Sequence, residues 1–257
     1  MKQEVYCFLI GTAGAGKSTL AQNFKKWCHQ QGLEAIIVNL DPGVKKLPYT
    51  PDIDIRDWIS LSEVMETHDL GPNGAQVACA DMIALNLGEV KETIEKFKSD
   101  YIIIDTPGQI ELFVFREAGK YTINNLNPKK TMVCYLIDPA LAHTPSGFVT
   151  QLLLSITTNF RLGTPQLNIL SKTDLLHKED LELIQSWSEN PEELYTAVTM
   201  EKTSMFQQMN EGILRLIQEF GGLTKLIHHS SKNLGDIADI YTLLQQEFEA
   251  GEDLLKD

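Results

Sequence analysis

Short runs of consecutive apolar residues alternate along this chain with longer stretches in which apolar residues recur every three or four positions. The short runs predict buried strands, and the longer stretches predict helices with one apolar face. The predicted strands cover residues 5–10, 34–40, 101–104, 132–137, 166–170 and 226–229. The predicted helices cover residues 18–29, 60–69, 75–98, 112–125, 146–161, 178–220 with a break near Asn190-Pro191, and 236–249.

This alternation predicts an α/β fold, with a mainly parallel sheet flanked by helices on both faces. Residues 44–58 show no periodicity and are predicted to be a loop. The apolar stripe of the helix at 75–98 predicts a core contact or a face shared with a second copy. No internal repeat or linker interrupts the pattern. The sequence therefore predicts one domain over residues 1–257, with 178–220 as a small helical insertion.

Composition narrows the class of function. The 257 residues carry a net charge of −13, which argues against a nucleic-acid surface, since such a surface needs clustered Lys and Arg. The cysteines at 7, 28, 79 and 134 form no C-x-x-C pair, and the six histidines show no metal-ligand spacing. No apolar run approaches the ~20 residues of a membrane span, and the first ten residues lack a signal-peptide pattern. We therefore expect a cytoplasmic protein in a reducing compartment, with no membrane contact.

The first strand leads directly into a glycine-rich loop that fits the pattern G-x-x-x-x-G-K-[ST]. Its residues are Gly11, Thr12, Ala13, Gly14, Ala15, Gly16, Lys17 and Ser18, followed by Thr19. Glycines let the backbone N–H groups approach phosphate oxygens, and the N-terminus of the following helix attracts anions. Lys17 would bind the β and γ phosphates, and Ser18 would bind Mg²⁺. The order of strand, loop and helix favours this interpretation over a glycine-rich turn without a ligand.

Two carboxylates follow later strands and predict a metal and water shell beside that loop. Asp41 comes directly after the strand at 34–40, at the end where parallel sheets bind their ligands. Asp105 begins the pattern D-x-x-G, and in P-loop NTPases such an Asp holds Mg²⁺. Gly108 would bring a backbone N–H toward the γ phosphate.

Gln109 and Glu111 are the two candidates for orienting the attacking water. Gln109 stands where Ras-like proteins carry the glutamine that orients this water. Glu111 could accept a proton, or it could simply favour a helix N-terminus.

Two later segments predict which nucleotide base the site would bind. Ser171-Lys172-Thr173-Asp174 resembles the guanine-reading motif N-K-x-D, with Ser in place of Asn. The Asp174 carboxylate would accept hydrogen bonds from guanine, and the Lys172 stem would lie over the base. Ser231, within Ser230-Ser231-Lys232, resembles the loop that backs guanine in GTPases. The order of these segments favours guanine over adenine.

The tripeptide Gly71-Pro72-Asn73 adds a family resemblance that extends from about residue 5 to residue 232. The sequence resembles the GPN-loop GTPases. The resemblance rests on this tripeptide together with the phosphate loop, the Leu40-Asp41-Pro42 segment, residues 51–57 and 105–111, and the motif at 171–174. Gly43 stands where family members often have Ala, and the length resembles the archaeal branch. Without the resemblance, the tripeptide would be interpreted as a turn between helices.

The resemblance implies a SIMIBI-like P-loop NTPase that hydrolyses GTP to GDP with Mg²⁺ as a homodimeric switch. It also implies that Asn73 in the tripeptide reaches the partner's phosphate site. Eukaryotic relatives act in RNA polymerase II assembly and nuclear import, so the implied partner is a protein client related to RNA polymerase.

We therefore expect Ser18, Asp105 and Asp41 at the metal, with Gln109, Glu111, Asp41 and Asn73 in catalysis. The alternatives are a small-molecule kinase and a nucleotide-binding scaffold with little turnover. Arg56 and Arg116 are the positional candidates for an arginine finger.

Overall fold

The computed structural model describes residues 4–201, 212 and 226–253, and its centre is one parallel sheet. The strands are β1 (Val5–Gly11), β2 (Ala35–Asn39), β3 (Ile53–Asp54), β4 (Tyr101–Asp105), β5 (Thr131–Ile137), β6 (Gln166–Leu170) and β7 (Leu226–His228). They pair in the order β3-β2-β4-β1-β5-β6-β7, and every pairing between the described strands is parallel. The predicted fold class is confirmed.

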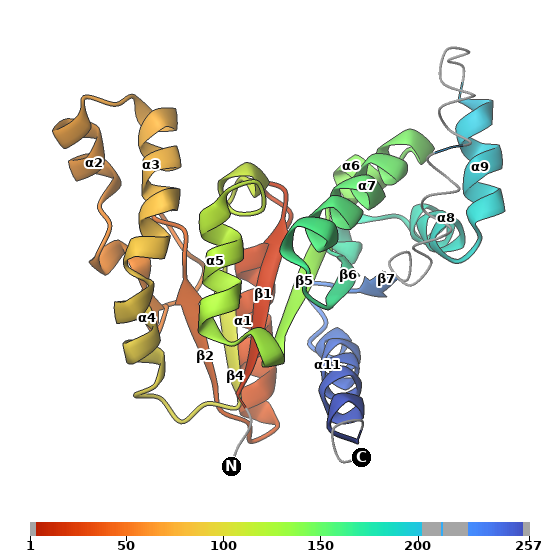
Figure 1. Cartoon of the computed structure of the whole chain (residues 1–257). Coiled ribbons are helices and arrows are strands. Elements are labelled where there is room, and N and C mark those ends of the chain that lie inside the picture. The colour runs from red at the N-terminus through yellow and green to blue at the C-terminus, as the bar shows by residue number, and fades with distance from the viewer. Residues whose placement is uncertain (1–3, 202–211, 213–225, 254–257) are drawn as a thin grey trace.

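Helices cover both faces of this sheet (Figure 1). They are α1 (Lys17–Gln30), α2 (Leu61–His68), α3 (Pro72–Leu85), α4 (Leu87–Ile94), α5 (Glu117–Leu126), α6 (Pro139–Ala142), α7 (Pro145–Leu162), α8 (Lys178–Glu189), α9 (Pro191–Met200) and α11 (Asp236–Asp253). Helices α1 and α11 pack on one face, and α2 to α9 contribute to the core of the other. None of the described helices is long and apolar enough to cross a membrane.

The strands are apolar on both sides because each face of the sheet is covered. In β1, Tyr6 and Phe8 belong to one core cluster, whereas Cys7 and Leu9 belong to the other. Strand β1 lies between β4 and β5, and the chain leaves it in opposite directions, toward β2 first and later toward β5. A reversal of this kind opens a crevice at the carboxyl ends of the strands.

The register brings polar side chains together at that edge. Asn39 on β2 is paired with Asp54 on β3 and with Asp105 on β4. Asp105 is in turn paired with Leu9, two residues before the glycine loop. Three polar residues from three strands therefore lie side by side next to the end of β1.

Three boundaries differ from the sequence prediction. Residues 44–58 contain β3 and the 3-10 helix η1 (Ile55–Asp57), because a two-residue strand is too short to produce a visible period. The predicted helix at 75–98 is two helices that meet at Asn86, whose side chain donates to the carbonyl oxygen of Met82 at 2.9 Å. The predicted helix at 112–125 begins later, at Glu117, after the 3-10 helix η2 (Ile110–Leu112).

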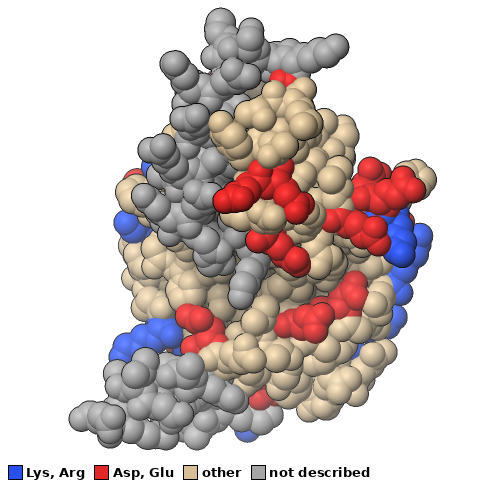
Figure 2. All heavy atoms as spheres, turned by 90° about the vertical axis from the view of Figure 1, so that its right-hand side faces the viewer, with Lys and Arg blue, Asp and Glu red and all other residues tan. Residues whose placement is uncertain are grey.

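The described part of the predicted insertion is the pair α8 and α9, which meet at Asn190 as expected. Apolar residues of both helices, including Trp187 and Leu194, pack into the main core. Asp and Glu side chains gather on the outer face that includes these helices (Figure 2). The exposed ones are Glu179, Glu182, Glu189, Glu192 and Glu193. The rest of the predicted helical stretch, from 202 to 220, lies outside the described residues apart from Gly212.

Replacing Gly119 of α5 by Ala should destabilise the fold, because a Cβ there would lie 2.0 Å from the carbonyl oxygen of Phe113. Overpacking of a buried site typically lowers the free energy of unfolding by about 1–3 kcal/mol. The matched variant is Gly88→Ala on α4, where a Cβ would meet nothing within 4 Å. That change should raise the free energy of unfolding by about 0.4–1 kcal/mol. Urea unfolding measures both, and equal midpoints for the two variants would contradict this packing.

Candidate functional site

The glycine loop turns tightly between β1 and α1, at the centre of the sheet edge. Gly14 and Gly16 have φ angles of 78° and 101°, a region that favours glycine. A Cβ on Gly11 would lie 2.6 Å from the carbonyl oxygen of Leu136 on β5. The loop borders a cavity of about 540 Å³. Its lining residues are Gly14, Gly16, Lys17, Ser18, Thr19, Asp41, Val44, Lys46, Leu47, Pro48, Asp105, Thr106 and Gly108.

Lys17 is a buried cation at this cavity, with 5% of its surface exposed. Its Nζ donates to three carbonyl oxygens, those of Gly11 at 2.9 Å, Thr12 at 3.1 Å and Gly108 at 3.0 Å. Burial lowers the pKa of Lys17, and the negative charges of Asp105 and Asp41 act against that shift. Lys17 therefore connects the glycine loop to the D-x-x-G segment across 91 positions of sequence.

Asp105 is the buried carboxylate of the cavity. Tyr49 donates its hydroxyl to Oδ2 of Asp105 at 2.7 Å, while Oδ1 is buried without a hydrogen-bond partner. Burial raises the pKa of Asp105, although Tyr49, the hydroxyl of Ser18 and the charge of Lys17 act against this shift. A hydroxyl oxygen from Ser18 and a bare carboxylate oxygen on one cavity wall are the hard ligands that Mg²⁺ prefers. The residues present therefore fit a magnesium ion.

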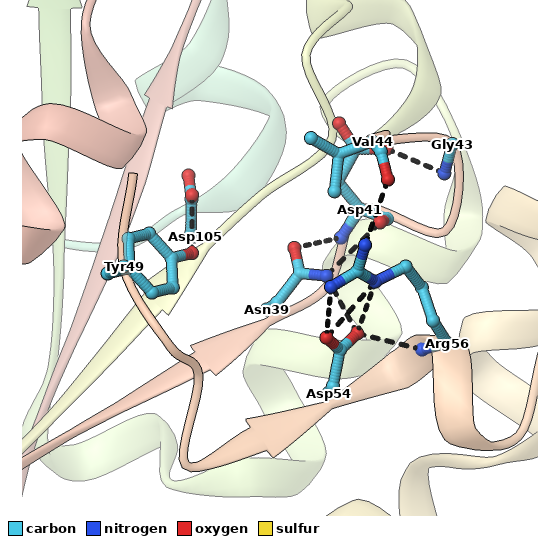
Figure 3. Close-up of polar contacts among 8 residues, drawn as sticks. All are labelled: Asn39, Asp41, Gly43, Val44, Tyr49, Asp54, Arg56 and Asp105. Carbon is cyan, nitrogen blue, oxygen red and sulfur yellow. Dashed lines mark hydrogen bonds and ion pairs between the residues drawn. The ribbon is translucent and has the colours of Figure 1, made fainter. Parts of the chain in front are cut away.

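Asp41, whose contact with Gly43 is drawn in Figure 3, joins the turn after β2 to the D-x-x-G segment. Its Oδ1 accepts the backbone N–H of Gly43 at 2.9 Å, and its Oδ2 accepts that of Gly108 at 3.0 Å. Gly108 is thus held on both sides, by Asp41 at its N–H and by Lys17 at its carbonyl oxygen. Its N–H lies at the cavity wall, where the sequence analysis places the γ phosphate.

Asp174 lies against the loop that follows β7. Its Oδ1 accepts the backbone N–H of Ser231 at 3.2 Å and the hydroxyl of Ser230 at 3.3 Å, and Lys232 lies 3.6 Å from Oδ2. Burial alone would raise the pKa of Asp174, but these hydrogen bonds and the charge of Lys232 hold it below its ordinary value. The two segments proposed to read the base therefore meet in space.

The base-reading segment also contacts the glycine loop. Ser171, which stands in place of Asn, donates its hydroxyl to the carbonyl oxygen of Ala15 at 2.5 Å. Lys172 adopts φ 52° and ψ 34°, and its Nζ pairs with Asp138 at 2.9 Å. A Cβ on Gly16 would lie 3.9 Å from Cε of Lys172. The segment predicted to read the base therefore packs directly against the glycine loop.

Comparison with known proteins agrees with this geometry. A family model described as "Conserved hypothetical ATP binding protein" matches residues 9–250. A GPN-loop GTPase of Pyrococcus abyssi is 31% identical over 93% of this chain and 95% of its own length. The crystal structure of that protein in apo form matches this chain with a TM-score of 0.83 and 30% identity. This match covers 94% of this chain and 96% of that one. The chain belongs to the GPN-loop GTPase family.

Two eukaryotic relatives extend the comparison. GPN-loop GTPase 3 of Eremothecium gossypii is 32% identical over 95% of this chain and 92% of its own length. GPN-loop GTPase 1 of Dictyostelium discoideum is 32% identical over 85% of this chain, which spans 55% of that longer protein. This chain therefore matches nearly the whole of the first relative and about half of the second.

In this GPN-loop GTPase the naming tripeptide forms the first turn of α3, and not a turn between helices. Gly71 is the N-cap residue and Pro72 is the first helical residue, a position that suits proline because its missing N–H would be unpaired. Asn73 is exposed and does not line the cavity of its own chain. Gln76, one turn later, lies beside the turn after β2, because a Cβ on Gly43 would be 3.6 Å from Nε2 of Gln76.

The two candidates for orienting water are exposed. Gln109 and Glu111 follow Gly108 on the D-x-x-G segment, but neither lines the cavity. The arginine-finger candidates are both paired within the chain. Arg56 binds Asp54, and Arg116 donates its Nε to Asp81 at 2.9 Å. The structure therefore brings the residues predicted to bind phosphate and metal together at one cavity, and it leaves the two water candidates exposed outside the cavity lining.

Sequence reasoning missed several residues of the site, chiefly Tyr49, Asn39 and Asp54. Tyr49 and Asp54 lie in the stretch at 44–58, which lacks a period. Asp54 belongs to the segment 51–57 that carries the family resemblance, but nothing in that segment indicated its role. Asn39 did leave a signal, because a single amide in an apolar strand needs a buried polar partner. It is fully buried and donates to Asp54 at 2.9 Å.

Replacing Asp105 by Asn should stabilise the protein without nucleotide, because a buried carboxylate with an unpartnered oxygen is replaced by a neutral amide. We expect the free energy of unfolding at neutral pH to rise by about 1–3 kcal/mol. The pKa of Asp105 is raised in the folded state, so its unfavourable charge is present at neutral pH and disappears in acid. The gain should therefore shrink as the pH falls. Urea unfolding against pH measures it, with exposed Asp57→Asn as a control that changes stability by less than about 0.5 kcal/mol.

Proposed function

We propose that this chain is a magnesium-dependent GTP hydrolase that works as a dimeric molecular switch. The observation that carries the proposal is the meeting of Lys17, Asp105 and Gly108 around one cavity. Asp174 and Ser231 contact each other in a segment that packs against the glycine loop. Phosphate-binding, metal-binding and base-reading groups thus lie along one edge of the sheet. Membership of the GPN-loop GTPases supports GTP as the substrate.

The phosphate end would bind through charge and backbone. The glycine loop offers its N–H groups to the phosphates, and Lys17 exchanges carbonyl partners for phosphate oxygens. Ser18 and Asp105 would hold Mg²⁺, with Asp41 supporting its water shell. The ion would supply positive charge to the β and γ phosphates as charge develops there. Catalysis at such a site depends mainly on positioning and on electrostatic stabilisation.

The D-x-x-G segment would respond to the γ phosphate. Gly108 donates its N–H to Asp41 and could donate it instead to a γ-phosphate oxygen. Gln109 follows directly, so a change at Gly108 would move the residue that orients water, and Glu111 is the second candidate for that role. This coupling between the phosphate and an exposed segment supports a switch.

The homodimer is supported by the position of the tripeptide. The N-terminal end of α3 projects beyond the carboxyl edge of the sheet (Figure 1), and Asn73 there is exposed. An exposed Asn73 that does not line its own cavity suits a contact with a second copy. A protein client related to RNA polymerase assembly follows from the family resemblance alone.

Base choice tests the substrate. Asp174→Asn should weaken GTP binding by about 2–4 kcal/mol, because guanine then loses a charged acceptor for two donors. The same change should favour xanthosine triphosphate, whose edge suits an amide. Competition against a fluorescent GTP analogue measures both affinities, with Asp57→Asn as the control. The unmodified protein should bind GTP more tightly than ATP, and equal affinities for the two nucleotides would contradict the assignment of guanine.

Mixing two inactive variants tests the dimer. Asn73→Ala keeps an intact glycine loop, and Lys17→Ala keeps an intact tripeptide but binds no nucleotide. If Asn73 acts on the partner, a mixed dimer has one complete site. Phosphate release should then exceed that of either variant alone by about tenfold, the effect of one hydrogen bond to a charged group. Native mass spectrometry confirms that mixed dimers form. No gain in confirmed mixed dimers would place the contact within one chain.

A further inference from the structure

Arg56 makes a fork onto one carboxylate beside the phosphate cavity (Figure 3). Its Nε lies 2.9 Å from Oδ1 and 3.0 Å from Oδ2 of Asp54, and its Nη2 lies 2.5 Å from Oδ2. Both residues come from the segment that the sequence analysis interpreted as loop. Bidentate pairs of this kind fix geometry as well as charge, because the planar guanidinium matches the carboxylate.

The Asp54 carboxylate that Arg56 holds is also hydrogen-bonded to Asn39 on the neighbouring strand. Asn39 donates to Oδ1 of Asp54 at 2.9 Å, and its own oxygen accepts the backbone N–H of Asp41 at 3.0 Å. The same amide group also donates to the carbonyl oxygen of Asp41 at 3.3 Å. The Asn39 side chain therefore holds both backbone groups of Asp41.

Arg56 holds the other end of the same turn directly. Its Nη1 donates to the carbonyl oxygen of Val44 at 3.1 Å. Residues 41–44, here called the Asp41 turn, are thus fixed at Asp41 through Asn39 and at Val44 by Arg56. We call Arg56, Asp54 and Asn39 the Arg56 clamp. The carboxylate of Asp41 projects from the clamped turn to the N–H of Gly108.

Electrostatics keeps the clamp charged. Burial alone would raise the pKa of Asp54, but hydrogen bonds from Arg56 and Asn39 hold it below its ordinary value. The Asp54 hydrogen bonds raise the pKa of Arg56. About two thirds of the Arg56 side chain is covered, since 34% is exposed. An arginine held in this way serves its own chain, and is not extended toward another site.

We propose that Arg56 is a positioning residue for GTP hydrolysis, acting through Asp54 and Asn39 to fix Asp41 against Gly108. The clamp sets where the Gly108 N–H and the adjoining Gln109 stand when the γ phosphate arrives. Its role in turnover rests on the proposed function. The geometry itself, a fixed Asp41 turn that restrains Gly108, stands without it.

The experiment compares four variants of the full chain. Arg56→Ala removes the fork. Arg56→Lys keeps a charge for Asp54 but has one nitrogen in place of the three that Arg56 uses, so it cannot form the fork. Asp54→Asn weakens the fork from the other side, and the double variant Arg56→Ala/Asp54→Asn tests whether the two act together.

Arg161→Ala is the matched control. Arg161 has a similarly covered side chain, 37% exposed, and it also combines a carbonyl partner with a carboxylate, here Val114 at 2.8 Å and Glu117 at 3.7 Å. It therefore reports what the loss of an anchored arginine does to the fold in general.

The first readout is hydrogen exchange of the nucleotide-free protein, followed in peptides that cover 40–46 and 106–112. Arg56→Ala should speed exchange of the Gly108 amide by at least about tenfold, because local opening then needs less free energy. Arg56→Lys should give an intermediate rate, and Arg161→Ala should leave the Gly108 amide unchanged. Unchanged exchange in Arg56→Ala overturns the clamp, whether or not the protein hydrolyses GTP.

The second readout separates turnover from binding. Arg56→Ala and Asp54→Asn should each lower kcat for GTP by at least about tenfold while the Kd for GDP changes less than about threefold, because the γ-phosphate end alone is affected. The double variant should lose no more than the worse single variant. A kcat within twofold of the unmodified protein, or an equal loss in Arg161→Ala, overturns the positioning role. Faster exchange in a protein that never hydrolyses GTP would instead refute the proposed function and leave the clamp standing.

Discussion

The Lys17 ammonium group and the Asp41 carboxylate hold Gly108 from opposite sides, one at its carbonyl oxygen and one at its N–H. These two hydrogen bonds join three parts of the chain that are far apart in sequence: the glycine loop, the turn after β2 and the D-x-x-G segment. A phosphate group offers oxygens to the same N–H and the same ammonium group. A phosphate bound at this site would therefore compete with contacts that hold the site together, and such competition would support the proposed switch.

Two polar groups near the carboxyl edge of the sheet are buried without a hydrogen-bond partner. One carboxylate oxygen of Asp105 has no hydrogen-bond partner, and neither does the hydroxyl of Thr12 in the glycine loop. In most buried positions such groups would be paired, because each unpaired one costs about 1–3 kcal/mol. Of these two groups Asp105 lines the cavity, where its unpaired oxygen is available to a ligand. The apolar strands below, covered on both faces, supply the compensating burial.

The smallest strand of the sheet has an effect out of proportion to its length. Strand β3 has two residues, yet it places Asp54 in register with Asn39 and, one strand further, with Asp105. Because Asp54 also receives the Arg56 fork, an edge strand of two residues determines how a turn in the phosphate cavity is held. The base end is organised differently, through a loop: Ser231 meets Asp174 there, and Ser171 ties the segment to Ala15.

The sequence by itself determined the parallel α/β class, the glycine loop and the carboxylates that follow the strands, because these depend on local periodicity and on residues a few positions apart. It also predicted that Asp174 and the Ser230–Lys232 loop serve one base, and the structure places them in contact. Only the tertiary structure decided that Tyr49 binds Asp105, that Asn86 breaks the long helix and that Arg56 binds its own chain. Tyr49 and Asp105 lie 56 positions apart, so their contact leaves no period in the sequence. The partners of Asn86 and Arg56 are only four and two positions away, but each contact involves a single polar side chain and therefore leaves no period either.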